Sequence, residues 1–183
     1  MPIPPQASPL HLRRFYFLRA AVAIVWVAIA FTVAHADQSI SIALLAIYAA
    51  WDALANYLDA QRTAQGTNRL QVINITVSVL AALGITAGWW GGFELSVAIF
   101  GAWAVLAGLL QLGVGIRRLR SGMKGQWVMI LSGAQSALAG GFFASLAYHK
   151  PTGIADLAPY ALMGGVYFLI SALWLSWKGR SVG

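Results

Sequence analysis

The chain has 183 residues, of which 60% are hydrophobic and only 9% are charged, and its formal net charge is +7 at pH 7. Soluble domains carry roughly 25% charged residues, so this chain cannot cover a water-facing surface and we expect the lipid bilayer to be its main solvent. The basic residues fall in short clusters between apolar runs, which excludes the continuous basic face of a nucleic-acid-binding protein. The absence of cysteine excludes disulfides and thiolate metal sites.

The N-terminal stretch and six apolar segments follow one another along the chain. Residues 1–14 contain four of the six prolines and no apolar periodicity, which predicts a disordered or interfacial tail. Each later segment has about 20 residues, enough for an α-helix to cross a hydrocarbon core of ~30 Å. Backbone groups in lipid must be satisfied internally, which favours helices. We expect an all-α, polytopic six-helix transmembrane bundle, one domain over residues 15–178, with helices at 17–36, 41–60, 70–90, 95–116, 127–148 and 157–177.

The basic residues predict the orientation of these helices. Eleven of the twelve Lys and Arg residues lie at one end of the predicted bundle, and Lys150 alone lies at the other. The positive-inside rule makes the eleven cytoplasmic. We therefore expect both termini in the cytoplasm, including a short tail at residues 179–183.

A second interpretation of the N-terminus stays open. Arg13 and Arg14 precede an apolar run that ends in Ala34-His35-Ala36, which is the pattern of a cleavable secretory signal. Cleavage would leave five helices and an unpaired 41–60 helix. The internal repeat described next favours a retained first helix.

An internal repeat relates the second, fourth and sixth helices. Residues 46–58 align without a gap with residues 98–110, at 7 identities in 13 positions, and the sixth helix matches more faintly. Such self-similarity indicates a repeated supersecondary unit. The unit is a helical hairpin of roughly 55 residues, whose short loop makes its helices antiparallel neighbours. We expect three such hairpins, at 17–60, 70–116 and 127–177.

Small residues recur along these helices at four-residue spacings, as in Gly133-x-x-x-Ala137-x-x-x-Gly141. Helices in lipid associate through close packing at such faces. We expect the packing to be within the chain, and a homo-oligomer through one of these small-residue faces is the alternative.

Three short hairpins, six helices and the run Gly101-Ala-Trp-Ala-Val-Leu-Ala-Gly108, whose helix ends at a basic residue, resemble the HdeD-like acid-resistance membrane proteins. The resemblance covers most of residues 15–178, and the chain departs from the family pattern at Asn56 and Ser171, where glycine is frequent. The resemblance implies a location in the bacterial inner membrane and a role in acid or envelope stress. It supplies no catalytic residues.

The 41–60 helix carries the only acidic residues inside an apolar segment, Asp52 and Asp59. Together with Asn56 they occupy positions i, i+4 and i+7, so they form a polar stripe on one helix face. A charge at the centre of a membrane helix costs ~2.5–3.5 kcal/mol on insertion scales, so such residues pair or line a cavity. We expect Arg62 and Arg19 to be the partners of Asp59.

Three further polar residues lie at a similar depth, namely Asn74, Gln111 and Gln135. If the hairpins pack with pseudo-symmetry, these side chains converge with the stripe. One interpretation is a proton or small-solute site centred on Asp52. The favoured interpretation is a structural hydrogen-bond cluster, because a conductive pathway needs more ionisable groups.

Two histidines, His35 and His149, lie at the predicted outer ends of helices. Histidine titrates near pH 6.5, which offers acid sensing a mechanism, and the alternative is that both are simply hydrated at helix ends. A metal site needs three or four convergent ligands, so we expect no metal and no other cofactor. The zinc-protease, phosphate-loop and nucleophile-elbow motifs are absent from the sequence, which predicts that the protein is not an enzyme.

Three functions are compatible with these features. The first is a non-enzymatic, HdeD-like integral membrane protein of the acid or envelope stress response. The second is a small proton-coupled transporter or permease that uses Asp52. The third is a membrane assembly or interaction subunit, whose protein partner the sequence does not identify.

Overall fold

The computed structural model describes residues 9–32, 37–62, 69–120, 122, 126–149 and 153–180. Within these residues the chain is helical and contains no strand, which confirms the all-α prediction. Six spans are long and apolar enough to cross a membrane. The helices are α1 (Pro9–Thr32), α2 (Gln38–Arg62), α3 (Arg69–Ile85), α4 (Gly88–Gly91), α5 (Phe93–Arg120), α6 (Trp127–Leu146) and α7 (Ile154–Arg180).

The helices at the two ends of the chain extend beyond the predicted apolar segments. α1 begins at Pro9, so residues 9–14 of the predicted tail are helical, and Pro suits this first turn because its φ is already helical. α7 continues to Arg180, into the predicted tail at 179–183. Hydropathy indicates which residues suit the hydrocarbon core of a bilayer. An α-helix can continue beyond these residues as long as its backbone hydrogen bonds remain favourable.

The predicted 70–90 helix is interrupted. The Thr86 hydroxyl donates to the Leu83 carbonyl at 2.6 Å, and two short backbone turns separate α3 from α4. The buried Ser96 hydroxyl donates to the carbonyl of Ile85 at 2.8 Å, which satisfies an acceptor at the end of α3. Gly92, with φ of 90°, then lets the chain reverse into α5.

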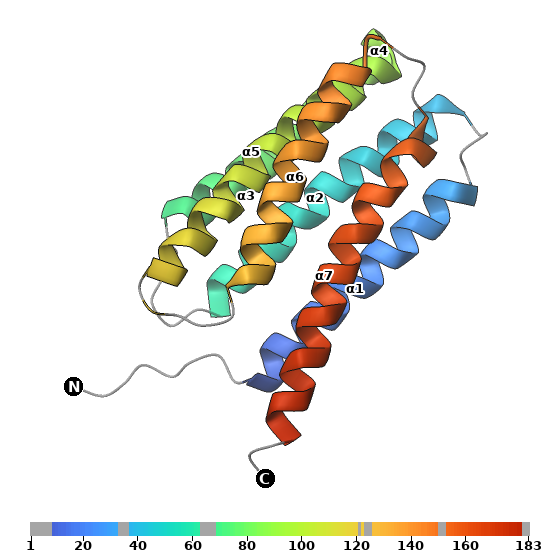
Figure 1. The fold of residues 1–183 in the computed structure, drawn as a ribbon. Helices are drawn as coiled ribbons and strands as arrows, with labels where there is room; N and C mark the ends of the chain where they lie inside the picture. Colours follow the sequence, from blue (N-terminus) through green and yellow to red (C-terminus); the bar gives the residue numbers. More distant parts are fainter. Residues whose placement is uncertain are drawn as a thin grey trace.

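The helices pack most extensively as three antiparallel pairs, α5 with α6, α1 with α7, and α2 with α3 (Figure 1). The partners in two of the predicted hairpins, α1 with α2 and α6 with α7, contact each other much less. α1 and α7 come from opposite ends of the chain and lie side by side. The repeated-hairpin organisation therefore stays a prediction from the sequence.

In the α5/α6 pair, glycines of one helix face backbone atoms of the other. A Cβ atom at Gly108 would lie 2.5 Å from the Ala137 nitrogen and 2.7 Å from the Gly133 oxygen. One at Gly101 would lie 2.6 Å from the Ala144 nitrogen. These small residues bring the two backbones together inside the chain, as the sequence predicted. Gly141, in contrast, faces open space, and the oligomer alternative stays a prediction.

Aromatic rings fill the region where the α1/α7 pair meets the other helices. The Tyr48 ring lies 5.0 Å from Trp26 and 6.1 Å from Phe100, measured between ring centroids. Phe100 also contacts Tyr160 at 5.9 Å in an edge-to-face arrangement. Such contacts add to the packing that joins the helices. The cluster comprises Trp26, Tyr48, Phe100, Trp103, Phe143 and Tyr160.

Candidate functional site

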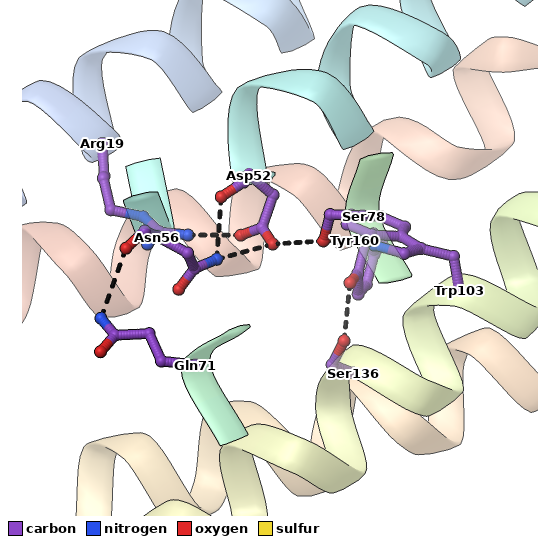
Figure 2. A network of polar contacts seen from close by, with 8 residues as sticks. All are labelled: Arg19, Asp52, Asn56, Gln71, Ser78, Trp103, Ser136 and Tyr160. Carbon is purple, nitrogen blue, oxygen red and sulfur yellow. Dashed lines mark hydrogen bonds and ion pairs between the residues drawn. The ribbon is translucent and has the colours of Figure 1, made fainter. Parts of the chain in front are cut away.

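Asp52 is the centre of a polar network that is buried between helices (Figure 2). Nη2 of Arg19 donates to its Oδ1 atom at 2.6 Å. Its Oδ2 atom accepts hydrogen bonds from the Asn56 amide at 2.9 Å and from the Ser78 hydroxyl at 3.0 Å. Only 15% of the Arg19 side chain and 17% of the Asp52 side chain is exposed. Asp52 therefore faces a packed interface and not lipid.

The network joins four helices. The indole Nε1 of Trp103 on α5 donates to the Ser78 hydroxyl at 3.0 Å, and Ser78 is fully buried on α3. Arg19 brings in α1 and Asp52 brings in α2. Because every contact runs between different helices except the one from Asn56, loss of the carboxylate would loosen several interfaces at once.

The structure corrects the expected partner of Arg19. We expected it to approach Asp59, near the end of α2, but it bonds to Asp52. The reason is the register of α1 against α2, which brings Arg19 opposite Asp52, seven residues before Asp59 in α2. Its guanidinium lies over the ring of Phe168 at 4.3 Å, so an aromatic face on α7 also holds the charge.

A second polar stripe on α3 faces the predicted stripe on α2. Nε2 of Gln71 donates to Oδ2 of Asp59 at 3.2 Å and to the backbone oxygen of Asn56 at 3.3 Å. Gln71 and Ser78 are members of the polar network that sequence reasoning missed. The sequence did contain a signal for them. In two antiparallel helices joined by a short loop, residues at equal distances before and after the middle of the loop lie opposite each other. With position 65 as that middle, Asp59 lies opposite Gln71 and Asp52 lies opposite Ser78.

The other predicted polar residues separate into two groups. Asn74 lies at i+3 from Gln71, on the same face of α3, and the same symmetry places it opposite Asn56. Gln111 instead donates to the backbone oxygen of Met129 on α6 at 3.4 Å. Among the described residues, no hydrogen bond links Gln111 or Gln135 to the stripe, and one buried oxygen on each of Asn74 and Gln135 has no partner.

A separate polar contact links α6 to α7. The hydroxyls of Ser136 and Tyr160 lie 2.7 Å apart (Figure 2). The Ser136 hydroxyl also donates to the Ala104 oxygen on α5 at 3.1 Å. On the α1 side, the indole of Trp26 donates to the Leu44 oxygen at 2.8 Å. Single hydrogen bonds of this kind fasten the α1/α7 pair to the other helices.

At the end of the bundle opposite the basic clusters, the described structure includes one of the two histidines considered above. His35 lies outside the described residues, and His149 is exposed just after α6. Asp37 caps α2 there, because its Oδ1 accepts a hydrogen bond from the Ser39 N–H at 2.8 Å. This bond, and then the Ser39 hydroxyl, lowers the pKa of Asp37 below its usual 3.8. Within the described part of the chain, no three acidic or histidine side chains group as metal ligands do.

A small cavity lies beside the Arg19–Asp52 pair. Its volume is about 30 Å³, which is room for one or two water molecules. Pockets that bind organic ligands are roughly 300–1,000 Å³, so this cavity is too small for such a solute. It is lined by Arg19, Ala23, Tyr48, Trp51, Asp52 and Phe168.

Comparison with known proteins finds no match: no family model fits the chain, and no curated protein or solved structure is significantly similar. The resemblance to the HdeD-like family therefore depends on the sequence pattern alone. The interpretation of the Asp52 network depends on its geometry.

Proposed function

We propose that this chain is a non-enzymatic, multi-pass protein of the bacterial inner membrane, similar to the HdeD-like family, that acts in the response to acid or envelope stress. In this proposal its three repeated hairpins are anchored with both termini in the cytoplasm. The Arg19–Asp52 pair is a structural lock that fixes α1, α2, α3 and α5 relative to one another.

The observation that carries the structural role is the complete bonding of the Asp52 carboxylate. Both oxygens are engaged by protein donors from Arg19, Asn56 and Ser78. A solute-binding carboxylate would leave oxygens turned toward a cavity of substrate size, whereas the adjoining cavity has about 30 Å³. A buried ion pair that is satisfied in this way confers specificity of packing.

A second candidate, the proton-coupled transporter, has one observation in its favour. Asp52 is ionisable, lies near the middle of a membrane-spanning helix and borders a cavity large enough for water. Intramembrane carboxylates in such positions serve as proton relays in pumps and transporters.

One genetic experiment separates the two candidates. Cells that lack the protein are compared with cells that express the wild type or the Arg19→Leu/Asp52→Leu double variant, during exposure to acid and to envelope stress. The structural proposal expects the deletion to lower survival and both proteins to restore it, provided the variant reaches the membrane in equal amount. Normal survival of the deletion strain would refute the stress role. Failure of an equally abundant double variant would favour the proton relay.

A further inference from the structure

Two buried polar atoms next to the Asp52 network lack protein partners. They are Nε of Arg19 and Oδ1 of Asn74. An unsatisfied polar group in an apolar environment is destabilising, so such atoms normally bond to ordered water. The Arg19 side chain lines the 30 Å³ cavity together with Asp52. The cavity meets both conditions for a buried water, sufficient volume and several polar neighbours.

The polar stripes connect this region to one end of the bundle. That end is where α2 finishes at Arg62 and α3 begins at Arg69, and we name it the basic end. Asp59 and Gln71 lie nearest to it, and Asn74 lies between Gln71 and Ser78 on the inner face of α3. Asp52 is ten residues from Arg62, which is about 15 Å along the helix axis. A line of hydrogen-bonding groups thus runs from the basic end to the membrane centre.

The opposite half of the bundle is closed by apolar side chains. Its buried polar side chains include Ser96, whose hydroxyl donates to the Ile85 oxygen, and Trp26, whose indole donates to the Leu44 oxygen. Most of the described interior in this half is apolar. It is filled by Ile42, Leu45, Ile85, Phe93, Val97, Ile154 and Leu157, each at most 3% exposed.

We infer a one-sided water-access site, in which water enters from the basic end along the polar faces of α2 and α3. It reaches the Arg19–Asp52 pair at the cavity that lies between α1, α2 and α7. The ligands of this site are water and the protons that water carries. Water bonds to the free oxygen of Asn74 and, in the cavity, to Nε of Arg19. The site stops at the membrane centre, so it hydrates the ion pair without forming a pore across the membrane.

This inference goes beyond the proposed stress function and does not depend on it. Only the compartment that the basic end faces depends on the proposed orientation. An experiment that reads both sides of the membrane therefore distinguishes a failure of the site from a failure of the orientation.

The natural absence of cysteine allows single cysteines to be introduced into the wild-type chain. Asn74→Cys and Ser78→Cys report on the water-access face of α3. Ile73→Cys and Val79→Cys are matched controls, because each is one residue away on a lipid-facing surface, at 46% and 44% exposed. The probe is Ag⁺, a small cation that reacts with thiolates, and thiolates form only where water reaches the sulfur.

Ag⁺ is added to right-side-out and to inverted membrane vesicles in chloride-free buffer. Reacted thiols are then scored by their protection from alkylation after denaturation. We expect Ag⁺ to protect Asn74→Cys and Ser78→Cys in one vesicle orientation only. The rate of protection should be about tenfold or more above that at the two control positions. Arg14→Cys and Tyr148→Cys, exposed at the basic end and the opposite end, identify which side each orientation presents.

The outcomes decide the inference. Protection from the side that also modifies Arg14→Cys supports it, whichever compartment that side proves to be. No protection at either test position, equal protection at the lipid-facing controls, or protection from the side of Tyr148→Cys overturns it. Each variant must elute from size-exclusion chromatography like the wild type, and the two test positions are independent, so failure of one to fold leaves the other decisive.

Discussion

At the scale of single residues, Asp52 is tolerated in the interior of the bundle because three donors share its charge. The guanidinium of Arg19 neutralises it at 2.6 Å, and the amide of Asn56 and the hydroxyl of Ser78 complete its hydrogen bonds. Breaking a buried pair by removing one partner is costly because the other charge is left uncompensated, whereas an apolar pair of similar size is often neutral.

A double-mutant cycle tests this pairing. We expect Arg19→Leu and Asp52→Leu each to lower the free energy of unfolding by about 3 kcal/mol, since each leaves one buried charge alone. The Arg19→Leu/Asp52→Leu double variant should regain most of this loss. The measurement is equilibrium unfolding in mixed micelles, followed by helical circular dichroism. Additive losses in the double variant would show that the two residues act independently.

Asp37 makes a pH-dependent contribution at the start of α2. Its pKa is lowered below 3.8 in the folded protein, so its stabilising effect is complete above the unfolded pKa and disappears as the pH falls through the lowered value. Against an Asp37→Asn variant, we expect a small advantage in Tm that is constant from roughly pH 5 to pH 8. The advantage should vanish below the lowered pKa. An advantage that falls between pH 8 and pH 5 would contradict the assignment of the carboxylate as the cap.

At the scale of secondary-structure elements, glycine decides which helices meet most closely. In α5 and α6, Gly101 and Gly108 face backbone atoms of the partner helix, while Gly113 and Gly141 have no atom within 4 Å of where a Cβ would be. The same residue type therefore has two different consequences along one pair of helices. The four-residue spacing predicts Gly133 and Gly141 alike as packing glycines, but only Gly133 faces backbone of the partner helix.

Alanine substitution separates the two sets of glycines. Gly108→Ala should lower the free energy of unfolding by roughly 1–3 kcal/mol, because its methyl group would overlap the Ala137 nitrogen and the helices must move apart. Gly113→Ala, five residues further along α5, is the matched control and should be neutral or slightly stabilising, since Ala favours a helix over Gly. Thermal unfolding in detergent measures both. If both substitutions lowered the stability equally, the cause would be a change within α5 and not the loss of its close contact with α6.

At the scale of the whole molecule, the first and last helices of the chain pack against each other. α1 packs mainly against α7, and only a few contacts, including Arg19 with Asp52 and Trp26 with Leu44, join α1 to α2. The first helix is therefore an integral part of the bundle. Removal of α1 would expose the faces of α7 and α2 that it covers and would delete one side of the ion pair.

This arrangement predicts that the first helix is retained. We expect the protein isolated from membranes to retain α1, because α1 is required to cover α7. Intact-protein mass spectrometry measures this directly. A product shortened by about 36 residues, as signal cleavage after the Ala34-His35-Ala36 motif would produce, would contradict the packing role of α1.

Hydropathy and length identified, from the sequence alone, six segments long and apolar enough to cross a membrane, because crossing a hydrocarbon core needs a local run of apolar residues. The stripe of Asp52, Asn56 and Asp59 was equally local, since helical spacing fixes which residues share a face. Counting equal numbers of residues back into α2 and forward into α3 from the loop between them would have added Gln71 and Ser78 to the same prediction.

Only the tertiary structure decided the partner of each polar residue and the pairing of the helices. Lipid chains are as apolar as leucine, so hydropathy does not distinguish a face that meets lipid from one that meets another helix. The α1/α7 pair joins segments from opposite ends of the chain, which no local pattern encodes. The register of α1 against α2 then placed Arg19 beside Asp52 and not beside Asp59, and that register depends on the packing of the whole bundle.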